Sequence, residues 1–408
     1  MRYLKILADD LTGAADTAAQ CRRFGLPATI FLDIPKLPLP PGALAFTSDS
    51  RHLPAEVAAR QTRDTAASLP AVDGRWYKKI DSTLRGNIGS ELDALLNLVC
   101  PPAAVVCPAF PAQNRGLCNG ILTVPGLESP AVHLPSLLRE QSRHTVAALS
   151  LEQVRSGELA GEMRQAMRTR ENCAEEGPVV FAVDSLTDDD LDRVLKAQQE
   201  VLPEALLCGS AGLAGALVRR VGAQEGFPAM PAERLHSEGK SVLLVAGSGS
   251  DVAHRQIECL LSSESEDPHQ AVSRMIVQPE SDAWGTAALD PAQPIWLLQQ
   301  PFPKPGSVLE GGEARRRADH LARVSVAALG RREVDLLLLV GGDTAIRILT
   351  RLNVRRLTVE QELLPGMPLC SAVIDGRPTL VVLKPGHFGE DGTLVALLDS
   401  VGLSGAGA

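Results

Sequence analysis

Short apolar runs alternate along the chain with longer amphipathic stretches, and a turn bearing glycine or aspartate usually separates the two. Brief apolar runs are typical of buried strands, whereas apolar positions three and four residues apart are typical of helices. Repeated strand–turn–helix units predict a parallel α/β architecture. In the first half we expect strands at 3–8, 28–33, 43–47, 75–80, 103–110, 178–185 and 205–210, and helices at 12–24, 54–69, 89–99 and 211–222. The stretch 111–150 is rich in Pro and Gly and has no clear period.

This alternation stops at 222–240, where Gly, Pro and charged residues replace it, and restarts at 241. Because 408 residues exceed the size of one ordinary core, two domains are expected. We predict an N-terminal domain at 1–228, a linker at 229–240 and a C-terminal domain at 241–408, each a largely parallel sheet flanked by helices. The second domain is expected to have strands at 241–248, 273–278, 295–300, 335–342 and 379–386, and helices from 251, at 312–330 and at 343–352.

Composition narrows the function classes. The net charge of −9 and an aromatic content of 3% argue against a general binder of nucleic acids or anionic membranes. No apolar run approaches the roughly 20 residues of a membrane helix, and the first residues lack the pattern of a signal peptide. Eight cysteines without a CxxC pair are typical of buried thiols. We therefore expect a cytoplasmic globular protein.

The segment LADDLTGAAD (7–16) places Asp9 and Asp10 where a predicted strand meets a predicted helix. Ligands of open α/β sheets bind at such strand ends, especially where the strand order reverses. One aspartate could cap the helix while the other stays solvated, but capping needs only one of them. A carboxylate there could instead orient a substrate hydroxyl and accept its proton.

A second turn concentrates charge. YKKIDSTLRGNIGSE (77–91) places Lys79, Asp81, Ser82 and Arg85 between a strand and a helix. Arginine binds a planar carboxylate with two bonds, and Asp and Ser bond hydroxyls. The mixture favours a ligand that carries both groups, although any single member could belong to an ordinary surface turn. Arg51 in TSDSR (47–51) is a further candidate for the carboxylate, and CPAFPAQNRG (107–116) offers Gln113, Asn114 and Arg115.

Three glycine-rich turns follow apolar strands in the second half. Without side chains, glycines let backbone amides approach phosphate oxygens at a helix N-terminus. The candidates for nucleotide contact are Gly247, Ser248 and Gly249 in VAGSGSD; Gly341, Gly342, Asp343 and Thr344 in LLVGGDTA; and Lys384 and Gly386 in LKPGHFG. One such turn is a weak signal, but three in one domain indicate phosphate chemistry.

The sequence lacks the motifs of several other enzyme classes. The chain contains no GxxxxGK[ST], no protein-kinase HRD or DFG, and no complete GxGxxG. A phosphatase of the haloacid dehalogenase type needs DxD, whereas Asp9 and Asp10 are adjacent. A two-domain ligand-binding protein without catalysis is the non-enzyme alternative, but it leaves three phosphate-type turns unexplained.

The ordered set of motifs resembles the four-carbon acid sugar kinases, ATP-dependent enzymes that act on D-threonate, D-erythronate and 3-oxo-tetronates. The matching stretches span nearly the whole chain: LADDLTGAAD, TSDSR, KKIDSTLRGNIGSE, CPAFPAQNRG, CGSAGLA, VAGSGS, LLVGGDTA, LLPGMPL and LKPGHFG. The final KPGHFG is more similar to the D-threonate branch than to the KSGNFG-like form of the 3-oxo-tetronate branch.

The resemblance implies that the first domain binds the sugar acid, the second binds ATP, and phosphate reaches the fourth-carbon hydroxyl in the interdomain cleft. D-threonate is the expected substrate, with D-erythronate and 3-oxo-tetronate as alternatives. Mg²⁺ is expected without assigned ligands, and a homo-oligomer is compatible with the sequence. The implied substrate contacts are Asp9, Arg51, Lys79, Ile80, Asp81 and Ser82, and the implied nucleotide contacts are Ser248, Gly341–Thr344 and Gly386. Either Asp9 or Asp81 would position the hydroxyl.

Overall fold

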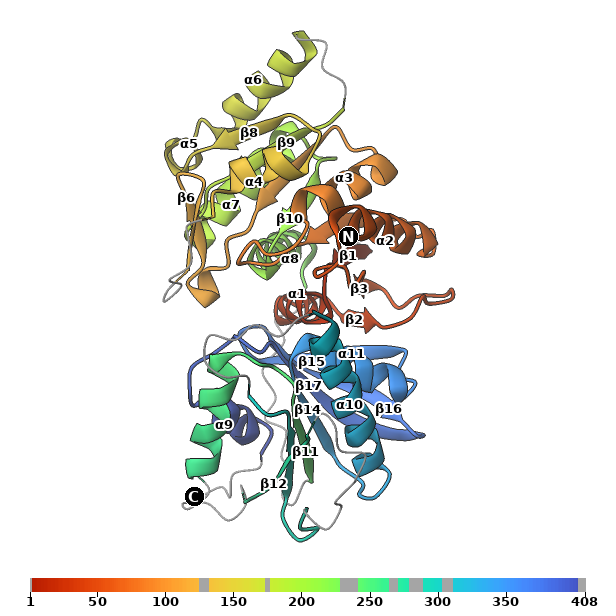
Figure 1. Cartoon of the computed structure of the whole chain (residues 1–408). Coiled ribbons are helices and arrows are strands. Elements are labelled where there is room, and N and C mark those ends of the chain that lie inside the picture. The colour runs from red at the N-terminus through yellow and green to blue at the C-terminus, as the bar shows by residue number, and fades with distance from the viewer. Residues whose placement is uncertain are drawn as a thin grey trace. The chain divides into compact units, whose positions relative to one another are not determined.

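The computed structural model of the chain divides into two compact units, residues 1–230 and 231–408. It describes residues 2–124, 132–172, 177–227, 241–263, 271–278, 289–302 and 311–402. The predicted linker at 229–240 lies outside these described residues. Both units are α/β, as predicted, and each is built around one sheet (Figure 1).

The N-terminal unit contains a wholly parallel sheet of order β2-β3-β1-β4-β10-β5-β9-β8. From β1 the chain forms β2 and then β3 on one side of β1, and it later adds β4 on the other side, so the strand order reverses at β1. The strands are β1 (Tyr3–Ala8), β2 (Ala28–Phe31), β3 (Gly42–Thr47), β4 (Arg75–Lys79), β5 (Ala103–Cys107), β8 (Val146–Leu149), β9 (Val179–Val183) and β10 (Leu206–Gly209).

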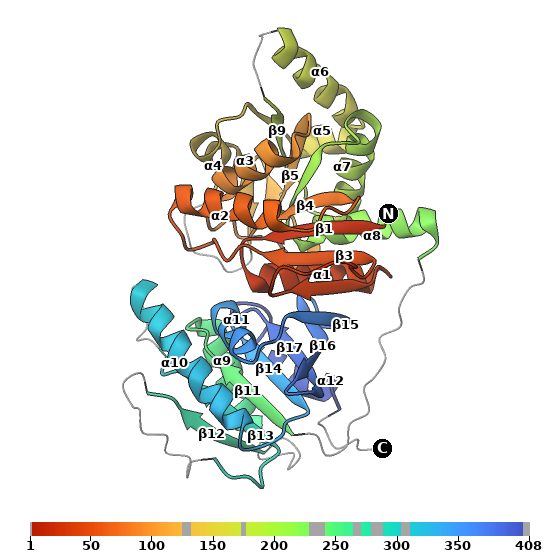
Figure 2. The same ribbon diagram turned by 90° about the vertical axis from the view of Figure 1, so that its right-hand side faces the viewer.

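Helices cover both faces of this sheet. Figure 2 shows α1 on one face of β1 and β3 and α2 with α3 on the other, and α8 packs against α1. On the latter face Leu92, Leu95 and Leu96 join strand residues such as Leu7 and Val106 in one buried cluster. The helices are α1 (Leu11–Arg23), α2 (Ala55–Ser68), α3 (Ile88–Val99), α4 (Leu134–Gln141), α5 (Leu151–Ser156), α6 (Leu159–Asn172), α7 (Asp188–Val201) and α8 (Ala211–Glu225).

The stretch that had no clear period does contain elements. A small hairpin, β6 (Gly116–Cys118) and β7 (Ile121–Thr123), precedes α4 and the edge strand β8. These elements are too short for a recognisable period. By contrast, α7 begins with a clear local signal, since Thr187 and Asp190 form a capping box at its start.

The C-terminal unit has the strand order β12-β13-β11-β14-β17-β16-β15. The first five strands of this order, from β12 to β17, pair in parallel with one another. The remaining pairs are antiparallel, because β16 runs antiparallel to both β17 and β15. The strand order reverses at β11. The strands are β11 (Val242–Ala246), β12 (Val272–Ile276), β13 (Ile295–Gln299), β14 (Leu336–Val340), β15 (Arg356–Leu364), β16 (Met367–Ile374) and β17 (Arg377–Lys384).

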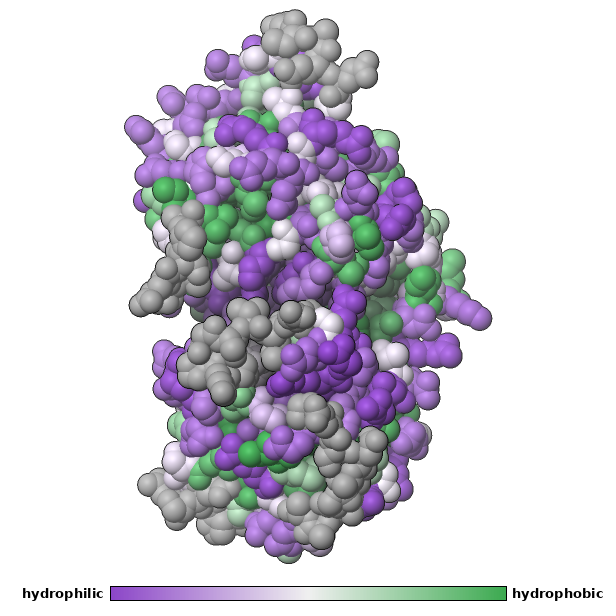
Figure 3. Space-filling view, viewed as in Figure 1, coloured by the Kyte–Doolittle hydropathy of each residue, from purple (hydrophilic) through white to green (hydrophobic). Residues whose placement is uncertain are grey.

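The helices of this unit also lie on two faces, α9 with α12 on one and α10 with α11 on the other (Figure 1). They are α9 (Asp251–Ser263), α10 (Gly311–Leu329), α11 (Gly342–Arg351) and α12 (Thr393–Ser400). Among the described residues, no helix is long and apolar enough to cross a membrane. In the view of Figure 3 polar and apolar side chains are interspersed, and exposed large apolar residues such as Leu37, Leu98 and Val373 are far apart in the sequence.

Candidate active site

Three adjacent parallel strands place predicted site residues at one edge of the N-terminal sheet. Asp9 follows β1, Arg51 lies four residues after the end of β3, and Asp81 lies two residues after the end of β4. Since β1 is paired with β3 and β4, these turns meet where the strand order reverses. The structure therefore brings together the residues that the sequence places at 9, 51 and 81.

Arg51 holds both aspartates of the first motif. Its Nε donates to Oδ2 of Asp9 at 2.8 Å and its Nη2 to Oδ1 of Asp9 at 2.7 Å, while Nη1 reaches Oδ2 of Asp10 at 2.5 Å. Asp10 also caps α1, because its Oδ1 accepts from the backbone nitrogen of Gly13 at 2.6 Å. Asp9 is only 4% exposed. One aspartate does cap the helix, but the other is buried against an arginine.

Around Asp81, a second group of polar side chains gathers. Both Arg85 Nε and Thr83 Oγ1 donate to its Oδ2. Next to it the buried Ser82 accepts from Nη1 of Arg115 at 2.5 Å. Arg115 comes from the loop after β5, so the predicted CPAFPAQNRG loop contributes a buried guanidinium to the same edge.

Lys79 approaches the start of α1. Its Nζ lies 3.4 Å from Oδ1 of Asp16, and a Cβ added at Gly13 would lie 2.9 Å from the same Nζ. Gly13 therefore provides the space that the ammonium occupies. The side chain of Ile80 is buried in the apolar cluster, and its contact with a substrate stays a prediction.

Charge compensation sets the ionisation of these carboxyls. Burial alone raises the pKa of Asp9, but Arg51, Lys78 and Lys79 outweigh it and bring the pKa below its usual value. The pKa of Asp81 is well below its usual value for the same reason, with burial opposed by Arg51 and Arg85. Asp16 differs: burial raises its pKa to about 6 despite the nearby Lys79.

In the C-terminal unit the three glycine-rich turns follow three neighbouring parallel strands, β11, β14 and β17. Ser250 Oγ donates to the carbonyl oxygen of Gly386 at 2.7 Å, and a Cβ at Gly386 would lie 2.0 Å from Ser248 Oγ. A Cβ at Gly247 would lie 1.9 Å from Thr344 Oγ1. The turns thus touch one another at positions that only glycine can occupy.

Gly341 begins α11 with a φ of 105°, a left-handed conformation that favours glycine. Gly342 and Asp343 form the first turn of that helix, and Asp343 is exposed while Thr344 is buried. Gly249 lies in the turn before α9. Backbone amides and one carboxylate therefore occupy the edge of the sheet at which the strand order reverses.

Lys384, a predicted nucleotide contact, lies inside the third glycine-rich turn, and its contact with phosphate stays a prediction. Its side chain is buried, and Nζ donates to the carbonyl oxygens of Pro385 at 3.0 Å and Phe388 at 3.1 Å. Gln256 of α9 donates to Phe388 and Glu390 in the same turn. Burial lowers the pKa of Lys384 to about 7. In this structure Lys384 shapes the third glycine-rich turn from within.

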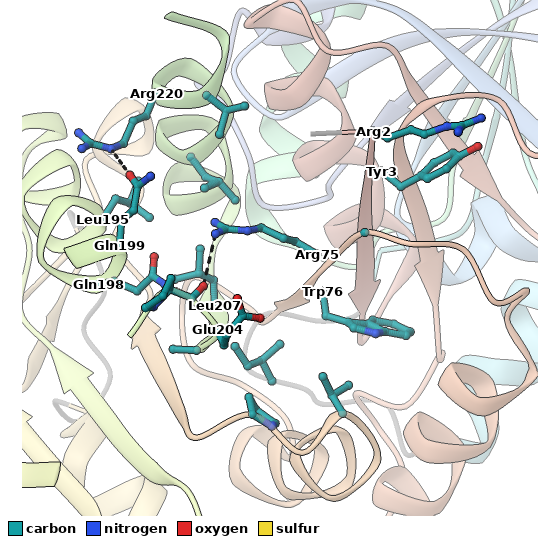
Figure 4. Close-up of a pocket in the computed structure, with 18 of the residues that line it drawn as sticks. Arg2, Tyr3, Arg75, Trp76, Leu195, Gln198, Gln199, Glu204, Leu207 and Arg220 are labelled. Carbon is teal, nitrogen blue, oxygen red and sulfur yellow. Dashed lines mark hydrogen bonds between the residues drawn. The ribbon is translucent and has the colours of Figure 1, made fainter. Parts of the chain in front are cut away.

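The described residues contain no group of three or more His, Cys, Asp or Glu side chains placed to hold a metal ion. A cavity of about 520 Å³ lies in the N-terminal unit, but it opens at the opposite edge of the sheet, where β1, β4 and β10 begin (Figure 4). Arg75 and Arg220 point into it and bond to Pro203 and Gln199. It contains none of the predicted site residues.

Sequence reasoning missed four buried residues at the carboxyl edge of the N-terminal sheet. All four lie inside quoted motifs, Asp16 in 7–16, Ser48 and Ser50 in 47–51, and Glu91 in 77–91, but their residue types alone do not show that they are buried. Glu91 forms an ion pair with Lys78 at 2.7 Å. The only signal was that Lys78 and Lys79 are adjacent in a strand, so that they must face opposite sides of the sheet.

Comparison with known proteins supports this division of chemistry. A model described as a sugar-binding N-terminal domain matches residues 4–217, and one described as a nucleotide-binding C-terminal domain matches residues 243–394. A D-threonate kinase of Bordetella bronchiseptica is 31% identical, covering 98% of this chain and 97% of that protein. A D-erythronate kinase of Heliobacterium modesticaldum is 27% identical, covering 98% of this chain and 97% of that protein. A 3-oxo-tetronate kinase of Methylobacterium radiotolerans is 27% identical, covering 95% of this chain and 96% of that protein.

Solved structures agree on the fold. A Haemophilus influenzae protein aligns over 97% of this chain and 100% of its own with a TM-score of 0.69 at 22% identity. A Salmonella typhimurium protein titled a putative tRNA synthase aligns over 97% and 98% with a TM-score of 0.73 at 21% identity. At these identities the likeness shows the fold alone. From the two matching domain models and the full-length relatives, the chain belongs to the four-carbon acid sugar kinases, a family of ATP-dependent enzymes.

Proposed function

We propose that this protein transfers the γ-phosphoryl group of ATP to the terminal hydroxyl of a four-carbon sugar acid, and that D-threonate is its substrate. The observation that carries the proposal is the charge-balanced group of carboxylates and cations where the N-terminal strand order reverses, in which every side chain except the half-exposed Arg85 is buried or largely buried. Such a mixture suits a small ligand that has both a carboxylate and hydroxyls. Its members are Asp9, Asp10, Asp16, Asp81, Arg51, Lys79, Arg85 and Arg115.

Lys79 and Arg115 are the cations that we assign to the carboxylate of the acid. Both side chains are buried at the carboxyl edge. Arg115 contacts the turn that bears Asp81, and Lys79 contacts the helix that follows Asp10. The contacts of Arg51 favour another role, since three of its nitrogens bind Asp9 and Asp10. A direct contact between Arg51 and the acid stays a prediction.

Asp81 is the carboxylate that we assign to the terminal hydroxyl. Both of its hydrogen bonds in the described structure end on Oδ2, whereas both oxygens of Asp9 are bound by Arg51. The hydroxyl oxygen attacks the γ-phosphorus, the bond to the β–γ bridging oxygen breaks, ADP leaves, and the hydroxyl proton passes to Asp81. A carboxyl with a lowered pKa is a weak base. Its main contribution is therefore orientation, which fits a loose phosphoryl transition state.

The glycine-rich turns of the C-terminal unit are assigned to the phosphates of ATP. The amides of Gly247 and Ser250 donate within the protein, to Val340 and Ser248, so the amides that we assign to phosphate oxygens are those of Ser248, Gly249 and the first turn of α11. The dipole of α11 favours negative charge there. Asp343, an exposed carboxylate in the first turn of α11, is the residue that we assign to a Mg²⁺ ion that would accompany ATP. When bound, this ion neutralises charge on the transferred phosphoryl group.

The choice of D-threonate rests on two supports. The relatives named D-threonate kinase from Bordetella bronchiseptica and Cupriavidus necator are 31% and 30% identical, against 27% for the D-erythronate kinase. The KPGHFG form of the last motif also resembles that branch. D-erythronate and 3-oxo-tetronate are the alternative substrates, and cytoplasmic location belongs to the same proposal.

An ADP-release screen with D-threonate, D-erythronate, L-threonate and 3-oxo-tetronate tests the assignment. We expect the highest kcat/KM with D-threonate. A higher value with another of these acids would replace the substrate and keep the kinase class. ADP release that none of the four acids accelerates would overturn the assignment to four-carbon acids.

A further inference from the structure

A fully buried ion pair lies beneath the carboxyl edge of the N-terminal sheet and has no part in the proposed chemistry. Lys78 is 0% exposed, and its Nζ lies 2.7 Å from Oε2 of Glu91, on the opposite face of β4 from Lys79. Removing two charges from water is costly, and such pairs are often no more stabilising than apolar residues of the same size. A pair of this kind calls for a role besides stability.

Two serines connect this pair to the turn that bears Arg51. The second carboxylate oxygen of Glu91 accepts from Ser50 Oγ at 2.8 Å, and Ser50 Oγ lies 2.7 Å from Ser48 Oγ. Ser48 Oγ in turn bonds the carbonyl oxygen of Ala8 at 3.0 Å. Both serines are buried. We call Lys78, Glu91, Ser50 and Ser48 the buried relay.

The turn held by the relay has a costly backbone. Asp49, between the two serines, has a φ of 47°, in the left-handed region that non-glycine residues avoid. The backbone nitrogen of Ser50 donates to the carbonyl oxygen of Asp9 at 2.9 Å, and that of Arg51 to the same oxygen at 3.3 Å. This conformation delivers the Arg51 guanidinium to Asp9, and hydrogen bonds from Ser48 and Ser50 to buried partners hold it there.

We propose that the buried relay is a positioning device: Glu91, fixed by Lys78, holds Ser50 and thereby sets the 47–51 turn so that Arg51 orients Asp9. The inference rests on the proposed function, because Asp9 matters only if this edge binds the substrate. Its residues do not touch the acid. They act through Arg51.

The relay also acts through charge. Burial raises the pKa of Asp9, and the charge of Arg51 is the strongest effect that lowers it. Lys78 and Lys79 on β4 lower it further. Asp10, on the other side of Asp9, shares the same guanidinium. A looser 47–51 turn would weaken the Arg51 contact, so the pKa of Asp9 would rise.

The test compares Ser50→Ala with Ser142→Ala. The control removes a hydroxyl that donates to a carboxylate on the same helix α3, Asp93, at 2.6 Å, but does not contact the 47–51 turn. We expect Ser50→Ala to lower kcat about tenfold and to leave the KM for ATP unchanged. The acid limb of the pH profile of kcat/KM should shift to higher pH. Ser142→Ala should do none of these. Identical profiles for the two variants would overturn the proposal.

A second measurement separates this inference from the proposed function. Carboxyl ¹³C NMR, assigned with Asp9→Asn, follows the titration of Asp9 without any turnover. A higher pKa of Asp9 in Ser50→Ala than in Ser142→Ala supports the relay even if no four-carbon acid is phosphorylated. An equal pKa in both variants contradicts it, whatever the activity, and thermal unfolding of each variant verifies that both are folded.

Discussion

Arg51 illustrates, at the residue scale, what one sequence can reveal. The strand ends at 8, 47 and 79 follow from the apolar pattern, so the convergence of Asp9, Arg51 and Asp81 is predictable. The direction of the guanidinium is not, because it depends on a turn with a left-handed Asp49 and on a hydrogen bond from Ser50 to Glu91, which is 41 residues away in the chain. The same holds for Lys78, whose partner Glu91 is 13 residues away.

The first prediction concerns the two candidate carboxylates. Asp81→Asn should lower kcat by about 10²-fold or more while the KM for ATP stays near that of the wild type, because the hydroxyl loses its orienting acceptor. Steady-state kinetics measures this, with the exposed Asp73→Asn at the other edge of the sheet as the control. If Asp81→Asn keeps full turnover and Asp9→Asn is inactive, the carboxylate that orients the hydroxyl is Asp9 and this prediction is wrong.

Gly86 supports a second prediction. Its φ is 93°, and a Cβ there would lie 3.4 Å from Cγ of Arg51 and 3.6 Å from Oδ2 of Asp9. Gly86→Ala should therefore reduce the free energy of unfolding by about 1 kcal/mol or more, since Ala is strained at this φ. Urea unfolding measures the change. The control is Gly161→Ala in α6, where a Cβ meets open space and should stabilise the helix. A stabilised Gly86→Ala would contradict the account.

At the scale of elements, the strands and helices with a strong period were predictable, and the hairpin strands β15 and β16 were not. β1 is where the sequence places it, at Tyr3–Ala8, and the helix expected at 312–330 is α10, Gly311–Leu329. β15 alternates buried and exposed residues only in its first half and has irregular pairing near Gln361, so its pattern is faint. A strong pattern needs one regularly buried face.

The contact between Gly386 and Ser248 predicts a selective loss. Gly386→Ala would place its Cβ 2.0 Å from Ser248 Oγ, so the first and third glycine-rich turns must separate. We expect ATP affinity, measured by calorimetry, to fall at least tenfold, a loss of about 1.4 kcal/mol, while affinity for the acid is retained. Gly392→Ala, where a Cβ meets nothing, is the control. Unchanged ATP affinity would remove this turn from the nucleotide site.

The buried Lys384 predicts a dependence of stability on pH. Its pKa is about 7 in the folded protein, against 10.5 when unperturbed, because burial disfavours the charged ammonium. The unfolded chain therefore binds more protons between these two values, and this residue makes unfolding free energy rise as pH increases from about 7 to about 10. Lys384→Met should remove that part of the rise, as measured by urea unfolding at several pH values. An equal slope in both proteins would be the contrary result.

At the scale of the whole molecule, the two units use the same device for different ligands. Each places the turns that we assign to ligands at the carboxyl edge of a parallel sheet where the strand order reverses, at β1 in one and β11 in the other. The N-terminal turns carry carboxylates and cations, whereas the C-terminal turns carry glycines. The net charge of −9 indicates neither the cations in the N-terminal turns nor the glycine-rich turns of the C-terminal unit. Local pairing decides which anions each unit can bind.

The most direct test of the account identifies the bond that is formed. Proton-coupled ³¹P NMR of the product from ATP and D-threonate reports the carbon that bears the new phosphate. Transfer to the terminal hydroxyl predicts a phosphomonoester triplet from two adjacent protons, with one ADP formed per product. A doublet would place phosphate on an inner hydroxyl, and inorganic phosphate alone would mean that the protein hydrolyses ATP without transferring phosphate to the acid. Either result would contradict the central claim.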